Sequence, residues 1–290
     1  MSTESLAAPV DSDDAKREPP SAGHSVVLVV VFHMVVYFAF RGLSGRYPTP
    51  LSTAEVEFRP TLFSEEYARR HLMSLTSLGH RPTGSEANEV HAVRYIVDEI
   101  EKIRRTAHPV HSIHVDVQEA SGTFDLGFLN HFVQYYDNVK NILVRFEPKL
   151  PRGNLTDYIL INCHFDTVCQ SPGASDDAAS CCIMIETLRA LSSADEPFQH
   201  GIVFNFNGAE ENILQASHGF ITEHPWAQNV KAFVNLEGAG GGGWELLFQS
   251  GPQHPWLLKA YASAAPHPFA HAVAQDIFQR CLVQRDRVRD

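Results

Sequence analysis

The sequence lacks an excess of positive charge, and this absence excludes one class of function. Its 290 residues carry 23 Lys and Arg against 34 Asp and Glu, which gives a formal net charge of −11. A nucleic-acid partner requires a clustered cationic surface that neutralises its phosphates. We therefore expect no nucleic-acid partner. The composition is otherwise typical of globular proteins, so collagen-like, coiled-coil and wholly disordered chains are excluded as well.

Cysteine is also scarce. The five cysteines are an odd number, so they cannot close into a complete disulfide framework, and no CxxC pair is present for a zinc ribbon. The adjacent Cys181 and Cys182 lie in a helical pattern, where free cysteines are commonly small buried apolar residues. In an oxidising compartment, the possible disulfide joins Cys163 to Cys181 or Cys182, provided that the fold brings them together.

Long apolar runs are limited to one, at residues 25–40. The polar residues 1–24 before it predict a disordered tail. A helix over residues 23–43 is about 31 Å long, which is enough for a bilayer core. A cleavable signal peptide is the alternative, but Asp11, Asp13 and Asp14 stand where such a peptide carries positive charge. We predict an uncleaved transmembrane signal anchor over residues 25–42.

The flanking charges leave the orientation of this anchor open. Lys16 and Arg17 on one side balance Arg41 and Arg46 on the other. The sequon NLT at Asn154 favours a lumenal or extracellular position for the residues that follow the anchor, with Asn154 as the predicted glycosylation site.

Helical and strand patterns alternate after a predicted linker at residues 43–60. Ser64 and Ser85 are expected to cap two helices, and a third apolar helical stripe runs over residues 178–188. A half-exposed strand is expected at 113–117, and four more apolar strands at 139–146, 158–163, 202–206 and 232–236. This alternation predicts that residues 61–290 form a three-layer α/β/α sandwich on a mixed, mainly parallel sheet.

Four acidic or imidazole clusters follow these strands or open the helix between them. They are HFD at residues 164–166, the DD pair at 176–177, the EE pair at 210–211, and Glu237. Taken singly, each is typical of an ordinary polar loop or helix start. Ligands of open α/β sheets gather at the carboxyl ends of the strands, so loops there can bring all four clusters together. One imidazole with several carboxylates is the ligand set of a hydrolytic divalent-metal centre.

The same motifs resemble a known family. HFD at His164, PGASDD at Pro172, NGAEE at Asn207 and NLEGAG at Asn235 resemble the co-catalytic zinc exopeptidases of the aminopeptidase type, and GHRPTGS at residues 79–85 is similar to the stretch before that family's first main helix. The anchor, HFDTV and ASHGF point to a branch of the family in the endoplasmic reticulum membrane. The resemblance therefore implies a zinc exopeptidase-like domain that lies in the lumen and takes peptide substrates.

The resemblance also implies a role for each residue of the centre. His164, Asp176 and Glu237 would hold one Zn²⁺, and Asp176 would bridge to a second Zn²⁺ that Glu211 also binds. In this family the peptide bond between the two aspartates of PGASDD is commonly cis.

Two further residues take catalytic roles by the same resemblance. Asp166 would orient His164 through its other ring nitrogen, and Glu210 would act as the general base.

The sequence departs from the family pattern in two places. Glu237 stands where many members have aspartate, and none of His254, His267 and His271 lies in a recognisable version of the family's final histidine motif. The domain is therefore expected to be incomplete at its C-terminus, to hold one or fewer of the two zinc ions, and to be weakly active or inactive. The alternatives are a non-catalytic ectodomain for interaction or trafficking and a single-zinc chemistry similar to that of glutaminyl cyclases.

Overall fold

The computed structural model describes residues 22–127, 131–150, 155–238, 240–241, 243, 245–250, 254–270 and 273. Its chain divides into two compact units, Met1–Thr49 and Pro50–Asp290. The predicted glycosylation site Asn154, together with His271 and Cys281, lies outside the described residues, as does nearly all of the predicted N-terminal tail.

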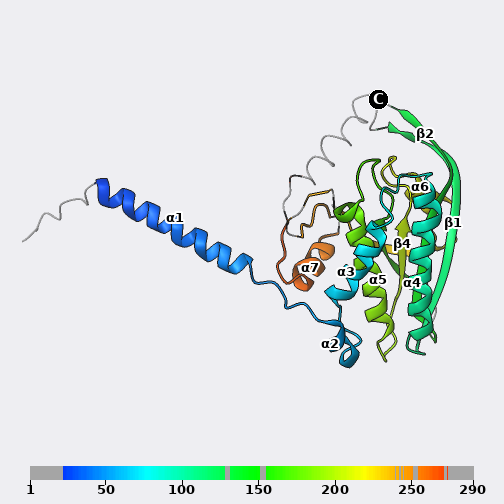
Figure 1. Ribbon diagram of the computed structural model, residues 1–290, viewed down its shortest axis with the longest axis horizontal. Helices are drawn as coiled ribbons and strands as arrows, with labels where there is room; N and C mark the ends of the chain where they lie inside the picture. Colours follow the sequence, from blue (N-terminus) through cyan, green and yellow to red (C-terminus); the bar gives the residue numbers. More distant parts are fainter. Residues whose placement is uncertain are drawn as a thin grey trace, which may run out of the picture. The chain divides into compact units, whose positions relative to one another are not determined.

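The first unit contains the helix α1, Ala22–Ser44 (Figure 1). It is the one helix in the described part of the chain that is long and apolar enough to cross a membrane. Its apolar side chains are exposed on every side, from Val26 to Leu43. A helix satisfies its backbone hydrogen bonds internally, as a membrane-spanning segment must. The predicted helix is therefore present, and its function as an anchor stays a prediction.

The second unit carries the remaining helices. The two predicted N-caps are made, because the Ser64 hydroxyl accepts a hydrogen bond from the Tyr67 amide and the Ser85 hydroxyl accepts one from the Asn88 amide. The helix expected after Ser85 begins with one π-helical stretch before it becomes regular. The helices are α2 (Thr53–Phe58), α3 (Glu65–Thr76), η1 (Ala87–Ala92), α4 (Val93–Thr106), η3 (Ala174–Ala178), α5 (Ala179–Ser192), α6 (Gln215–Glu223), η4 (Pro225–Asn229) and α7 (Pro255–Ala264).

The sheet has five described strands in the order β1-β2-β4-β3-β5. They are β1 (His111–Leu126), β2 (Phe132–Pro148), β3 (Tyr158–His164), β4 (Gly201–Asn207) and β5 (Val230–Asn235). The β1–β2 and β2–β4 pairs are antiparallel, whereas β3 pairs in parallel with both β4 and β5. The predicted mixed α/β sheet is therefore confirmed. The three parallel strands end at the same edge, and this edge carries the candidate site.

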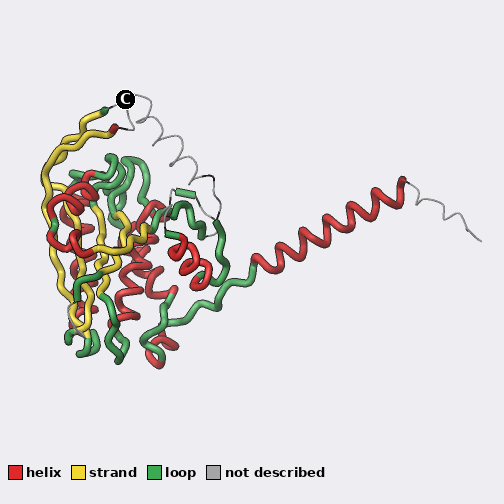
Figure 2. Tube along the Cα trace, turned by 180° about the vertical axis from the view of Figure 1, so that it is seen from behind, coloured by secondary structure: helices red, strands yellow, loops and turns green. Residues whose placement is uncertain are grey.

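Strands β1 and β2 are much longer than the sequence pattern predicts, and they form a long curved hairpin at one side of the sheet (Figure 2). Residues 141–146 of β2 pair with β4. The outer part of the hairpin, residues 122–126 and 132–136, pairs only within itself. Its side chains include the exposed Phe132, Val133 and Tyr135. The opposite face of this outer part is covered by α6, where Tyr136 is buried and Phe124 stacks on His218. Apolar side chains therefore occur on both faces of the outer part, and the sequence shows no clear alternation that would indicate it.

Helices cover both faces of the sheet. On one face Leu75 of α3, Ile96 and Ile100 of α4 and Ile185 of α5 pack against sheet residues such as Phe204. On the other face Phe220 of α6 packs against Leu143, Leu160 and Val203. The predicted three-layer α/β/α arrangement is confirmed, and its two apolar layers fix the strand ends from which the site loops emerge.

We predict that protonation of His111 destabilises this unit in acid. The ring packs against Phe146 and Phe198, its Nε2 is 2.9 Å from the Ala194 carbonyl, and its Nδ1 has no partner among the described residues. Burial lowers the pKa of His111 below the ordinary 6.5. The folded state therefore takes up a proton less readily than the unfolded state. The stability that this contributes is complete above pH 6.5 and is lost as the pH falls below it.

The measurement is the thermal unfolding midpoint from about pH 7.5 to about pH 5. In His111→Phe the unfolding midpoint is expected to fall less steeply as the pH is lowered. His114→Gln, at an exposed position of the same strand, serves as the control and should keep the wild-type slope. Equal slopes for the wild type and His111→Phe would contradict the prediction.

Candidate metal centre

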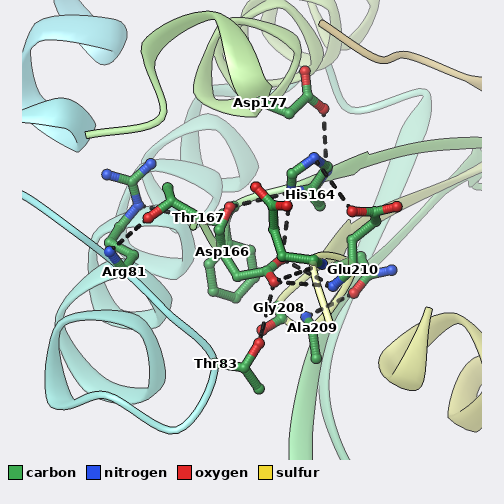
Figure 3. Close-up of polar contacts among 12 residues, drawn as sticks. Arg81, Thr83, His164, Asp166, Thr167, Asp177, Gly208, Ala209 and Glu210 are labelled. Carbon is green, nitrogen blue, oxygen red and sulfur yellow. Dashed lines mark hydrogen bonds and ion pairs between the residues drawn. The ribbon is translucent and has the colours of Figure 1, made fainter. Parts of the chain in front are cut away.

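The residues of the four predicted clusters converge at the carboxyl ends of the parallel strands. His164 is the last residue of β3, and Asp166 follows two residues later. Asp176 lies in η3, in front of α5, and Glu237 follows the end of β5. Glu210 follows β4 after a short turn (Figure 3). Residues far apart in the sequence therefore meet because their strands are parallel neighbours.

His164, Asp176 and Glu237 form a group that we call the metal triad. The His164 Nε2 atom lies 3.1 Å from Asp176 Oδ1 and 3.3 Å from Glu237 Oε1. One potential ligand atom from each residue lies within 4.8 Å of the other two, which is close enough for a single ion. The His164 ring is buried, whereas Asp176 and Glu237 are partly exposed and leave the site open to solvent.

A close backbone contact brings Glu237 to Asp176. A Cβ atom placed on Gly238 would lie 1.6 Å from the carbonyl oxygen of Ser175, so only glycine allows this approach. The peptide bond between Asp176 and Asp177 is cis, as the family resemblance implies. The loop after β5 and the loop before α5 are therefore in direct contact beside the triad.

The other ring nitrogen of His164 faces Asp166. Nδ1 lies 3.1 Å from the Asp166 carbonyl oxygen and 3.3 Å from its Oδ1 atom. The Asp166 carboxylate is fully buried and accepts hydrogen bonds from the amides of Glu210 and Glu211 and from the Thr83 hydroxyl. This is the arrangement that fixes the ring orientation and tautomer of a metal-binding histidine.

Glu210 stands beside the triad without belonging to it. The Oε2 atom of Glu210 is 3.9 Å from His164 Nε2, and the backbone amide of Glu210 donates a hydrogen bond to the Asp166 carboxylate. The pKa of Glu210 is raised to about 7, mainly by burial, which His164 opposes and the neighbouring carboxylates of Glu237 and Asp166 reinforce. A carboxylate with this pKa can both accept and return a proton near neutral pH.

The pKa values of two further groups, His164 and Asp177, are also raised at this centre. Burial lowers the pKa of His164, but its hydrogen bonds with Asp166 and Glu237 outweigh burial and raise this pKa to about 12. Asp177 is fully buried, accepts a hydrogen bond from the His164 amide, and has its pKa raised by burial to about 7. The centre therefore stabilises a cation at His164 Nε2.

The remaining predicted residues lie in different places. Glu211 is outside the triad, and its Oε1 atom accepts a hydrogen bond from the Val168 amide. Cys163 and Cys181 are buried free thiols whose sulfur atoms lie 2.9 Å apart. The fold thus provides the nearness that the possible disulfide requires, and the bond itself stays a prediction.

The sequence patterns assign no role to three residues that contact the site loops. Arg81 is fully buried and donates to the carbonyls of Phe165 and Pro172. The Thr83 hydroxyl donates to Asp166, and Nδ2 of the Asn88 side chain donates to the Gly208 carbonyl. The signal available in the sequence is their clustering within GHRPTGS and the helix start that follows. Their partners are mostly backbone carbonyls, which no residue pattern indicates.

A histidine–carboxylate group at the carboxyl ends of parallel strands, inside an α/β sandwich, is typical of metal-dependent hydrolases. The comparison with family models gives the same class: residues 141–288 match the model of peptidase family M28. The chain belongs to peptidase family M28.

Relatives in this family carry longer chains. The sequence is 53% identical over 224 residues to endoplasmic reticulum metallopeptidase 1 of Mus musculus, covering 77% of this chain and 25% of that protein. It is 44% identical over 283 residues to putative endoplasmic reticulum metallopeptidase 1-A of Caenorhabditis elegans, covering 96% of this chain and 31% of that protein. The chain therefore spans about a quarter to a third of these relatives. The predicted resemblance to a branch in the endoplasmic reticulum is confirmed.

A solved structure agrees with the fold. The LapA aminopeptidase of Legionella pneumophila superposes with a TM-score of 0.55 and 17% sequence identity, covering 79% of this chain and 60% of that one. At this identity the likeness concerns the architecture alone. It supports the α/β sandwich as the frame on which the metal triad is built.

Proposed function

We propose that the chain is the peptidase part of a membrane-anchored zinc metallopeptidase that removes residues from peptide N-termini. The observation that carries the proposal is the convergence of His164, Asp176 and Glu237 next to Glu210. Membership of peptidase family M28 supports hydrolysis of peptide bonds.

The donor set of the triad fits zinc. Zn²⁺ accepts imidazole nitrogen and carboxylate oxygen, and three protein ligands leave a position open for chemistry. His164 has its second nitrogen held by Asp166, so its Nε2 is directed toward the two carboxylates. For a second ion, the residues implied are Asp176 and Glu211. A bound zinc ion supplies Lewis-acid polarisation of the peptide carbonyl and lowers the pKa of water.

Glu210 has the position and the pKa for proton transfer in this reaction. It takes a proton from the attacking water as the new C–O bond forms at the scissile carbonyl. It then gives that proton to the departing amine as the C–N bond breaks, which balances the reaction as hydrolysis. Asp166 holds the Glu210 backbone and the His164 ring together, so base and ligand keep a fixed separation.

The charge of the site favours a free N-terminus as the substrate group. Asp176, Glu210, Glu211 and Glu237 are all partly exposed around the triad. An α-amino group has a pKa of about 8 and is largely protonated at neutral pH. Its positive charge complements these carboxylates, whereas an acetylated N-terminus has no charge to offer.

The apolar helix and the relatives support a proposal for the cellular location. We propose that α1 anchors the chain in the endoplasmic reticulum membrane with the peptidase unit in the lumen. The apolar helix and the names of the relatives support this location, and a lumenal position makes Asn154 accessible to glycosylation.

The test is to purify the full chain in detergent, measure its zinc content by mass spectrometry, and assay aminoacyl reporter substrates with and without N-acetylation. We expect one zinc ion per chain and weak turnover of the free-amine substrate alone, which a chelator removes. A chain that holds zinc but cleaves neither substrate would favour the non-catalytic alternative. A chain that holds no zinc would contradict the proposal.

A further inference from the structure

We infer that Arg81 is a positioning residue that fixes the distance between the two loops of the metal triad. This inference rests on the proposed function, because it concerns the zinc affinity of that same centre. The side chain is fully buried, and its guanidinium lies among backbone carbonyls that belong to separate parts of the chain.

The first loop that Arg81 holds is the one that carries His164 and Asp166. Its Nε donates to the carbonyl of Phe165, the residue between these two, at 2.8 Å. The backbone amide of Arg81 donates to the Thr167 hydroxyl at 2.9 Å (Figure 3), and the backbone carbonyl of Arg81 accepts a hydrogen bond from the Thr167 amide at 3.0 Å. The turn is therefore held on both sides of Asp166.

The second loop is the one that leads to Asp176. Nη1 of Arg81 donates to the carbonyl of Pro172 at 2.9 Å, and it also bonds the carbonyls of Leu75 and Gly79. One planar group thus joins the end of α3 to both triad loops. The Nε and Nη1 donors of a guanidinium have a fixed relative geometry, so the spacing of the carbonyls that they bond is fixed as well, whereas Nη2 has no partner among the described residues.

Gly173 shows how closely the second loop packs on this group. It has a φ of +59°, and a Cβ atom there would lie 3.1 Å from Arg81 Nη2 and 2.2 Å from Thr167 Cγ2. The loop therefore lies against Arg81 and Thr167 at a distance that only glycine permits. A shift of the guanidinium would move Pro172 and Gly173, and with them the start of η3, which carries Asp176.

The purpose of these bonds is positional, because the fold has other sources of stability. The layer of α3, α4 and α5 on the sheet is held by an apolar cluster that includes Ile96, Ile100, Ile185 and Phe204. Lysine keeps the charge but has a single ammonium nitrogen in place of the planar guanidinium, so it cannot bond the Phe165 and Pro172 carbonyls in the same geometry. Arg81→Lys should therefore disturb the centre more than the fold.

The experiment compares Arg81→Lys with Arg189→Lys in the full chain. Arg189 is the control because it also donates to two backbone carbonyls, those of Pro60 and Leu62, and its ion pair with Glu186 lies at the last turn of α5, away from the triad loops. We would measure the zinc dissociation constant by competition with a chromophoric chelator, the visible spectrum of the Co²⁺ form, and the thermal unfolding midpoint. A milder variant, Thr167→Val, removes the acceptor of the Arg81 amide together with the local bond from the Thr167 hydroxyl to the Val168 carbonyl.

We expect Arg81→Lys to weaken zinc binding about 10- to 100-fold and to alter the Co²⁺ spectrum, the range seen when a group that orients a metal ligand is lost. Thr167→Val should weaken zinc binding less, and Arg189→Lys should lower the unfolding midpoint at unchanged zinc affinity. Unchanged affinity in Arg81→Lys or in Thr167→Val, or an Arg81→Lys chain that does not fold, would overturn the inference. A wild-type chain that binds neither metal would instead contradict the proposed function.

Discussion

Glu210→Gln is expected to leave zinc bound and to lower kcat by about 10²- to 10⁴-fold, the contribution of a positioned general base. Glutamine has nearly the same shape, and the amide of residue 210 can still donate to Asp166. It cannot accept the proton of the attacking water, however. Because the Glu210 carboxylate lies beside the triad and does not belong to it, its loss should not remove a metal ligand.

The measurements are kcat with an aminoacyl reporter and the zinc content of the same preparation. Glu223→Gln, at an exposed position of α6, is the matched control and should keep both values. Wild-type turnover in Glu210→Gln would show that another group carries the proton. Loss of zinc in this variant would instead place Glu210 among the ligands.

Local patterns predicted most of the fold. The strands β3, β4 and β5 are short apolar runs, and α5 carries the apolar stripe that begins at Ala178, so pattern and structure agree there. The outer part of the β1–β2 hairpin could not be predicted because its pairing is internal and apolar residues lie on both of its faces, the buried Tyr136 on one and the exposed Tyr135 on the other. Hydrophobic periodicity indicates an isolated strand only where apolar residues are confined to the buried face.

The candidate centre could be predicted only as a set of loops. The rule that ligands gather at the carboxyl ends of parallel strands places His164, Asp176, Glu210 and Glu237 at one edge. It does not distinguish Glu210 from Glu211, since their separation depends on side-chain direction. In the structure Glu211 turns to the Val168 amide, whereas Glu210 faces His164.

Arg81 shows a different limit of sequence analysis. Nothing in the sequence around Arg81 indicates that it is buried, because charged side chains are seldom buried without an opposite charge. Its burial is explained by carbonyls from three separate segments, and these become neighbours only in the folded chain. Backbone acceptors carry no residue identity, so no motif indicates them.

His164→Ala is expected to weaken zinc binding more strongly than any other single change, by more than about 100-fold. It removes the nitrogen ligand and leaves Asp176, Glu237 and the buried Asp166 as carboxylates without their shared partner. Asp166→Asn keeps the imidazole but weakens the group that orients it, so its effect should fall between about 10- and 100-fold. The order of the two variants therefore separates a ligand from a residue that orients a ligand.

The test is a zinc competition titration of both variants, with His114→Gln on the exposed part of β1 as the control histidine. His114→Gln should bind zinc as the wild type does. An Asp166→Asn affinity below that of His164→Ala would mean that Asp166 holds the ion itself. Unchanged affinity in His164→Ala would remove the imidazole from the ligand set, and with it the reason for placing an ion between the loops of β3 and β5.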